Sequence, residues 1–118
     1  MVEFALAAAV FVTMLLGIIE FGFLAWEKNS VAADAREGTR YAIVHGTKSG
    51  RDATATMVSD YVKTKTSLGT SITVATTPAT VGDPGTEVTV TVSHVVPRRG
   101  PFLPTQTVSS TSKMIVLF

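Results

Sequence analysis

FALAAAVFVTMLLGIIEFGFLAW, residues 4–26, is the stretch that decides the fold. Only Glu20 among these 23 positions is charged. A helix rises about 1.5 Å per residue, so this segment spans roughly 35 Å, more than the ~30 Å hydrocarbon core of a bilayer. The run is longer than the apolar part of a cleaved secretory signal, no basic residue precedes it, and a helical pattern continues past it. We therefore expect a transmembrane helix.

The helix is predicted to continue beyond the apolar run. Residues 27–45 contain no proline to interrupt it. Four apolar or small residues recur there at helical spacing: Val31, Ala35, Gly38 and Ala42. His45 followed by Gly46 is typical of a helix end, with glycine at the C′ position. One helix is thus expected from about Glu3 to His45, with residues 1–46 as its domain and residues 27–46 packed on a sheet.

The rest of the chain, residues 47–118, is expected to form a small extracellular α+β head. Residues 49–67 have an apolar face at helical spacing and predict a second, short helix, capped by Ser49 or Asp52. Three later segments alternate β-branched and polar residues and predict strands: 71–76, 87–96 and 107–118. We expect a three-stranded antiparallel meander, with one face on the helices and a Thr/Ser face in water. The apolar end, 114–118, is expected in the core or at a subunit contact.

Composition argues against several classes of function. The net charge is +1 and gives no reason to expect a nucleic-acid partner. The basic pair Arg98-Arg99 stands in a Pro/Gly loop, where a solvated position is expected. There is no cysteine, no phosphate-binding loop and no metal-spaced cluster, and His45 and His94 fall on different elements. We predict no catalytic, metal or cofactor site and no enzyme activity.

Two carboxylates bracket most of the apolar run. A charge in hydrocarbon costs at least ~2.5 kcal/mol, so Glu3 and Glu20 need either an interfacial position or a task. For Glu20 both readings stay open: an interfacial position, or a polar contact inside the membrane or a filament core. Small residues such as Gly17 and Gly22 permit close packing of several copies of the helix. The abundant alanines also have a simpler explanation, which is their high helix propensity.

The N-terminal third resembles a known family. The opening Val2-Glu3-Phe4-Ala5-Leu6, the IIEFG of residues 18–22 and the AREGTRYA of residues 35–42 are similar to the TadE-like family of the Tad (Flp) pilus system. The resemblance implies a type IV filament architecture. Such a subunit is cut by a prepilin peptidase, held in the inner membrane, and then drawn by pilus assembly machinery into a helical homo-oligomeric filament on the cell surface.

The same resemblance suggests roles for individual residues. Glu3, followed by Phe4, matches the glutamate that meets the α-amino group of a neighbouring subunit during assembly. Glu20 matches a family glutamate by its surroundings. Many family members carry a proline within the apolar run, where this chain has AAAV at residues 7–10, so its helix is expected to be less prone to kink there.

Three hypotheses follow. The favoured one is a structural pilin that polymerises through its N-terminal helix. The alternative is a subunit that does not build the fibre, either a minor or priming pseudopilin or a single-pass, membrane-anchored binding domain. The third is an anchored hydrolase or binding enzyme that uses His45 and His94.

Overall fold

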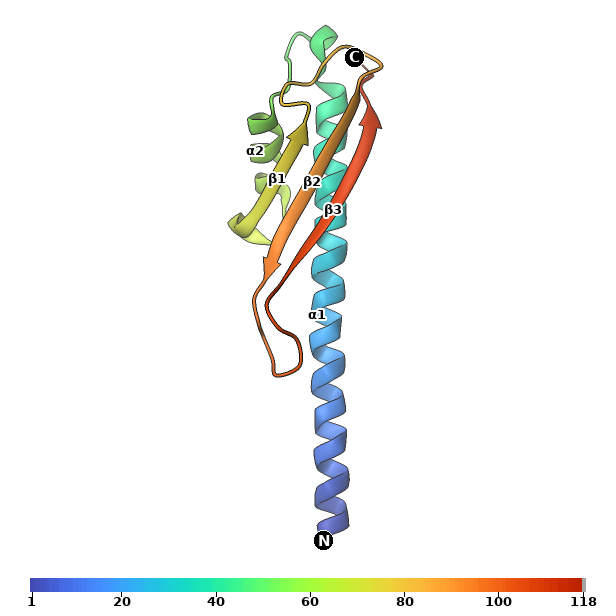
Figure 1. The fold of residues 1–118 in the computed structure, drawn as a ribbon, viewed down its shortest axis with the longest axis vertical. Coiled ribbons are helices and arrows are strands. Elements are labelled where there is room, and N and C mark those ends of the chain that lie inside the picture. The colour runs from blue at the N-terminus through green and yellow to red at the C-terminus, as the bar shows by residue number, and fades with distance from the viewer. Residues whose placement is uncertain (118) are drawn as a thin grey trace.

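Helix α1 (Val2–Val44) is the long axis of the molecule and carries the head along its C-terminal half (Figure 1). The computed structural model describes residues 1–117, which extend over 74 × 21 × 18 Å. No proline interrupts the helix, and neither Gly17 nor Gly22 bends it out of helical hydrogen bonding. The prediction of one unbroken helix is confirmed.

Helix α1 ends at the predicted place, before His45 and Gly46. The N–H of His45 donates to the carbonyl oxygen of Ala42 at 3.1 Å, which closes the last turn. Gly46 therefore follows the C-cap at the C′ position, as predicted, but its φ of −81° is extended backbone rather than the left-handed conformation common at that position. The left-handed glycine is Gly50, with φ 74°, which ends the short 3₁₀ helix Thr47–Ser49.

Helix α2 (Ala55–Lys65) is shorter than the predicted 49–67. Thr54 caps it: its backbone is extended and its Oγ1 accepts the N–H of Met57 at 3.3 Å. The expected caps, Ser49 and Asp52, are wrong because α2 begins only at Ala55, and Ser49 belongs to the preceding 3₁₀ helix, where its hydroxyl donates to the carbonyl oxygen of Gly46 at 2.7 Å. A second 3₁₀ helix, Gly69–Ser71, leads from α2 into the sheet.

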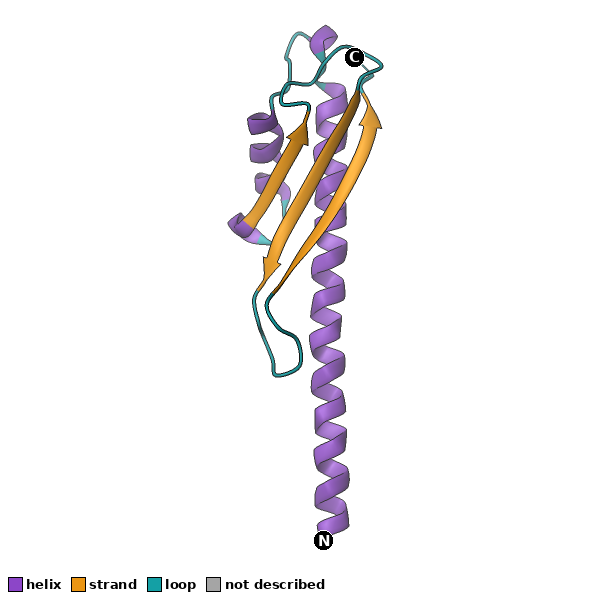
Figure 2. Ribbon diagram, viewed as in Figure 1, coloured by secondary structure: helices purple, strands orange, loops and turns teal. Residues whose placement is uncertain are grey.

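Three strands form the predicted antiparallel meander. They are β1 (Ile72–Thr77), β2 (Glu87–Val96) and β3 (Gln106–Ile115), in the order β1-β2-β3. Strand β2 is the central strand and its bounds agree with the prediction. One face of the sheet lies against α1 and α2, which gives a two-layer α+β head (Figure 2).

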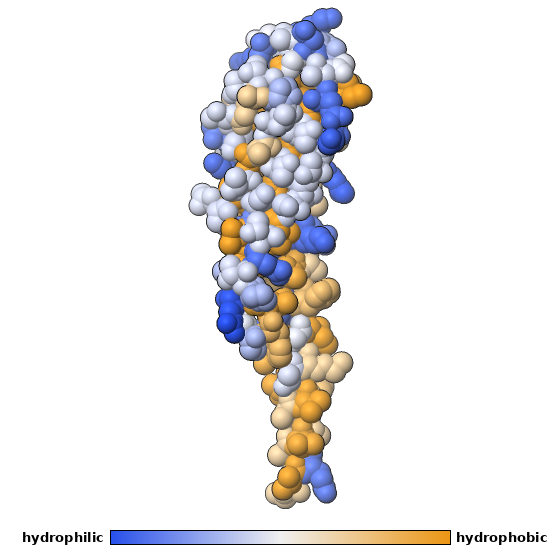
Figure 3. Space-filling view, viewed as in Figure 1, coloured by the Kyte–Doolittle hydropathy of each residue, from blue (hydrophilic) through white to orange (hydrophobic). Residues whose placement is uncertain are grey.

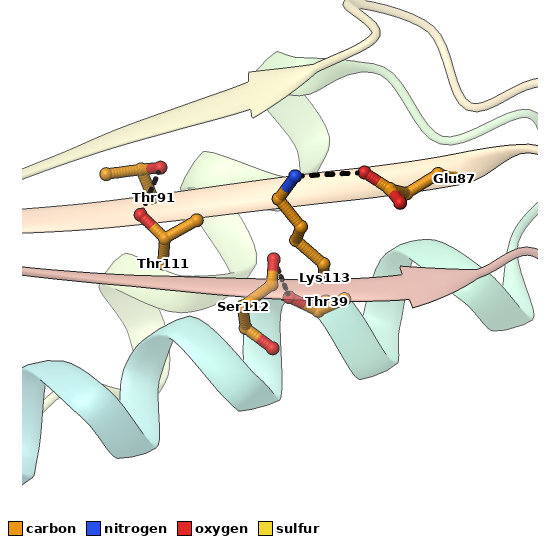
Figure 4. A network of polar contacts seen from close by, with 6 residues as sticks. All are labelled: Thr39, Glu87, Thr91, Thr111, Ser112 and Lys113. Atoms are coloured by element: carbon orange, nitrogen blue, oxygen red, sulfur yellow. Dashed lines mark hydrogen bonds and ion pairs between the residues drawn. The ribbon is translucent and has the colours of Figure 1, made fainter.

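Alternation of apolar and polar residues decides which face is buried. Alternate residues of β2 are buried, from Val88 to Val96, whereas the residues between them are partly or fully exposed. On the outer face Thr91 lies opposite Thr111, and their hydroxyls are 2.9 Å apart (Figure 4). Nearby, Lys113 and Glu87 form an exposed ion pair at 3.2 Å. The outer face is thus a solvent-exposed Thr/Ser surface, as expected.

The core of the head is built mainly from valine. Fourteen buried residues make one cluster: Val31, Ala35, Ala42, Ala53, Val58, Val62, Ile72, Val81, Val88, Val90, Val92, Val96, Val108 and Val116. Within residues 114–117, only Val116 belongs to this cluster, because Met114 is 38% exposed and Ile115 and Leu117 are about 60% exposed. Phe118 lies outside the described residues.

A hydrogen bond between side chains ties α2 to α1. The hydroxyl of Tyr61 donates to the Glu37 carboxylate at 2.8 Å, and the Tyr61 ring stacks on Tyr41 with centroids 4.3 Å apart. The hydrogen bond to Glu37 raises the pKa of Tyr61, because the neutral phenol is the donor. A second tie joins the Thr66 hydroxyl to Asp34.

Gly38 lies where α1 packs tightly against α2 and β2. A Cβ atom there would lie 2.8 Å from Cγ2 of Val62 and 3.1 Å from Cγ1 of Val90. We expect Gly38→Leu to destabilise the head by about 2 kcal/mol or more, since overpacking a dense core typically costs about 1–3 kcal/mol. Thermal unfolding of the full chain in detergent checks this. Gly17→Leu is the matched control: nothing lies within 4 Å of that site, so the head should melt at the wild-type temperature. Equal melting temperatures for both variants would contradict the packing account.

Candidate functional site: the bare segment of α1 and its junction with the head

The first part of α1, residues 2–19, has no partner within the described chain and is called here the bare segment. None of its residues is buried, and apolar side chains cover its whole circumference. Figure 3 shows the apolar surface concentrated at this narrow end, whereas the head is mainly polar. Among the described residues, α1 is the one helix long and apolar enough to cross a membrane. A helix that is apolar all round is suited to lipid or to a bundle of similar helices.

Glu3 and Phe4 lie in the first turn at the free end of the bare segment. Both side chains are exposed, and Phe4 keeps 78% of its surface in contact with solvent. Glu3 forms no ion pair or hydrogen bond with any other residue in 1–117. A negative charge near a helix N-terminus is favoured by the helix dipole, but its hydrogen-bonding capacity stays available for another molecule.

The predicted helix-packing residues fall into two groups. Ala35, Gly38 and Ala42 are buried between α1 and the head, where they pack within the chain. Gly17 and Gly22 have no side-chain neighbour within 4 Å. Only this second pair is free to let another helix approach closely.

Glu20 lies where the β2–β3 loop, residues 97–105, reaches α1. The loop extends past the sheet beside α1, toward the N-terminus (Figure 1). Its backbone donates to Glu20: the N–H of Leu103 lies 2.9 Å from Oε2, and the N–H of Phe102 lies 3.3 Å from the same oxygen. Gly100 contacts the carboxylate so closely that a Cβ atom there would overlap it. Backbone N–H groups of the same chain therefore supply hydrogen bonds to this carboxylate, although Glu20 lies far from the loop in sequence.

Glu27 is the most deeply buried charge of the junction. Its side chain is 1% exposed, and its Oε1 lies 2.9 Å from Nη2 of Arg99, a side chain that remains 46% exposed. The guanidinium N–H bonds do not point at the carboxylate, so neither Glu27 oxygen has an aligned donor among the described residues. Arg99 also lies over the Phe23 ring, 5.5 Å from its centroid. The interaction is one of charge rather than of an aligned hydrogen bond.

A small cavity lies between the loop and α1. Its volume is about 20 Å³, and Glu20, Glu27, Arg99 and Gln106 contribute its polar lining. The Nε2 of Gln106 is buried and has no acceptor among the described residues. The cavity is large enough for one water molecule and too small for an organic ligand.

The two histidines lie in separate places. His45 ends α1, where its Nδ1 lies 2.9 Å from the carbonyl oxygen of Tyr41 and its ring stacks on Tyr41. His94 is buried on β2, and its Nδ1 lies 3.2 Å from the hydroxyl of Ser71. The structure does not bring the pair together. Within residues 1–117, no group of three or more His, Asp or Glu side chains is placed to hold a metal ion.

Sequence reasoning missed the junction. Arg98 and Arg99 are exposed, as expected of a solvated loop, but the ion pair that Arg99 also makes with the buried Glu27 was not predicted. The signal that was available is the position of Glu27, four residues before Val31 on the buried stripe of α1. A carboxylate on a buried stripe needs a cationic partner. Arg98 and Arg99 are candidates for this partner, because they stand in a loop that also contains apolar residues.

Comparison with known proteins gives one match. The family model described as TadE-like protein matches residues 1–40, which cover the bare segment, Glu20, Glu27 and the first part of the packed stripe. No curated protein matches the chain. No solved structure matches it either.

Proposed function

Since residues 1–40 make this chain a TadE-like protein of the Tad pilus system, we propose that it is a structural pilin subunit, which polymerises through α1 into an extracellular filament. The observation that carries the proposal is the bare segment: an apolar length of helix, with no buried residue, that continues without a break into the packed core of the head. Such a helix is stable in a bilayer before assembly and in a bundle of like helices afterwards. A structural role, not a catalytic one, follows from this proposal.

The proposal assigns separate tasks to the two groups of small residues. Gly17 and Gly22, which contact nothing within the chain, become the close-approach points between neighbouring helices. Ala35, Gly38 and Ala42 hold the head on its own helix. Glu3, with Phe4 beside it, is the assembly residue, because its carboxylate is free to pair with a cationic group of another subunit. The neighbour's α-amino group is the partner that the family resemblance implies.

The proposal also places the chain in the cell. Before assembly α1 anchors it in the inner membrane, with the head on the outer side; a prepilin peptidase and the pilus assembly machinery act on it at this membrane. After extraction it is part of a surface filament. The family membership supports the association with pilus machinery, and the apolar helix supports the membrane stage.

Electron cryomicroscopy of filaments sheared from producing cells tests the proposal. We expect this chain to repeat along the fibre, with the bare segments in the centre and the heads outside. Fibres made of a different protein, with this chain recovered only in the membrane fraction, would overturn the proposal in favour of a minor pseudopilin or a plain anchor.

A further inference from the structure

The tip of the β2–β3 loop is an apolar surface beside the bare segment. It consists of Pro101, Phe102, Leu103 and Pro104. The Phe102 side chain is 48% exposed, and both prolines are exposed as well. An exposed aromatic ring between prolines is unusual in a head whose outer sheet face is covered by threonine and serine.

Contacts with Glu20 fix the height of this tip along α1. The backbone N–H groups of Phe102 and Leu103 both donate to the Glu20 carboxylate, and Gly100 fits against it. The ion pair between Arg99 and Glu27 holds the loop at a second level, about two turns further along the helix. The tip is therefore attached to α1 at a defined residue.

That height corresponds to the position expected for a membrane boundary on α1. Glu20 lies 17 residues after Glu3, or about 25 Å of helix, close to the ~30 Å thickness of the hydrocarbon core. The segment between the two carboxylates is uncharged, so each carboxylate can reach an opposite surface of the bilayer. Trp26, 47% exposed, lies just beyond Glu20, in the region where tryptophan concentrates at membrane surfaces.

We propose that the β2–β3 loop is a second membrane contact of this subunit: the Phe102 tip enters the interfacial layer of the phospholipid leaflet nearest the head, beside the point where α1 emerges. The inference rests on the proposed membrane stage of α1. With two contacts, α1 and the loop, any tilt of the rod that lifts the loop from the bilayer is opposed.

Apolar contact, rather than charge, dominates this interaction. Arg98 and Lys28 are exposed cations at this level, but Glu20 and the Glu27–Arg99 pair leave a net charge of only about +1 on the surface. The N–H at Nε of Arg98 also donates to the carbonyl oxygen of Gly100. Attraction to anionic lipid is therefore weak. The loop should enter a neutral phosphatidylcholine surface as readily as an anionic one.

Fluorescence quenching of single-tryptophan forms of the full chain in phosphatidylcholine vesicles tests the proposal. Trp26 in the wild-type chain reports insertion of α1. Phe102→Trp in a Trp26→Phe background reports the loop and keeps an aromatic ring at the tip. Thr47→Trp in the same background is the control, since Thr47 is exposed at the far end of the head.

We expect lipids brominated near the headgroup end of their acyl chains to quench the loop tryptophan at least twofold. We also expect acrylamide to quench it at least twofold less than the Thr47→Trp control, with little change when phosphatidylglycerol is added. A loop tryptophan as accessible to acrylamide as that control, in vesicles where Trp26 is quenched by bromine, would overturn the loop contact and leave the proposed function intact. Failure of bromine to quench Trp26 itself would overturn both.

Discussion

Filaments are expected to fall at least tenfold, to the limit of detection, when Glu3 is replaced by alanine, whereas the membrane pool of the subunit stays at its wild-type level. The reason is that Glu3 has no partner within residues 1–117 and lies on the bare segment, so polymerisation would bury it. A buried carboxylate is tolerated only when it is paired, and breaking such a pair costs about 3–5 kcal/mol. Each 1.4 kcal/mol is a factor of ten, so association of each subunit weakens by a factor of roughly 100 or more.

Two further variants distinguish this account from a general defect in membrane insertion. Glu3→Asp keeps the charge and should retain part of the assembly. Glu20→Gln changes the carboxylate at the other end of the apolar run, whose oxygens accept N–H groups from the chain's own loop, so filaments should persist. Immunoblots of sheared and membrane fractions measure both pools. Normal filament yield from Glu3→Ala would contradict an assembly role for this residue.

Arg99→Met is expected to destabilise the head by about 2 kcal/mol and to lower its melting temperature by about 10 °C. The substitution leaves the Glu27 carboxylate, 1% exposed, without a counter-ion. Half-exposure of Arg99 weakens the pair through solvent screening, which places the expected cost below the range for a fully buried pair. Thermal unfolding of the full chain in detergent, followed by circular dichroism, measures the change.

The reverse substitution should be far milder. Glu27→Met removes the buried charge and fills the same space with an apolar chain, while the Arg99 side chain can turn to solvent, so we expect a change of less than about 1 kcal/mol. The double variant should recover most of the stability lost in Arg99→Met. Arg98→Met is the matched control within the loop and should be close to wild type. A double variant as unstable as Arg99→Met would show that the loss comes from packing on Phe23 and not from the charge of Glu27.

Local patterns were sufficient to predict the elements of this fold. The absence of proline after Trp26 and the spacing of Val31, Ala35, Gly38 and Ala42 predict a single helix that packs along one stripe. The alternation of valine and threonine in 87–96 predicts the central strand with its correct bounds. These features are decided by interactions between residues that are only a few positions apart in the sequence.

The junction depends on contacts between residues about 70 to 80 positions apart, which no local period reveals. Glu20 meets the backbone of Phe102 and Leu103, and Glu27 meets Arg99, only because the β2–β3 loop extends beyond the sheet. The start of α2 was misplaced for a related reason. Ser49 belongs to the preceding 3₁₀ helix, whereas Thr54, which caps α2, forms a β-bridge with Thr80, 26 positions further along the chain.

The unbroken course of α1 links the direction of the Glu3 carboxylate to the orientation of the head. Successive residues of a helix are about 100° apart around its axis, so deleting one residue from the bare segment turns Glu3 by about 100° and shortens the rod by about 1.5 Å. Deleting seven restores the angle to within about 20° but removes about 10 Å. The helix has no hinge that could change this geometry. The number of residues between Glu3 and the head therefore sets both the axial distance and the angle around the helix axis at which one subunit presents its carboxylate to the next.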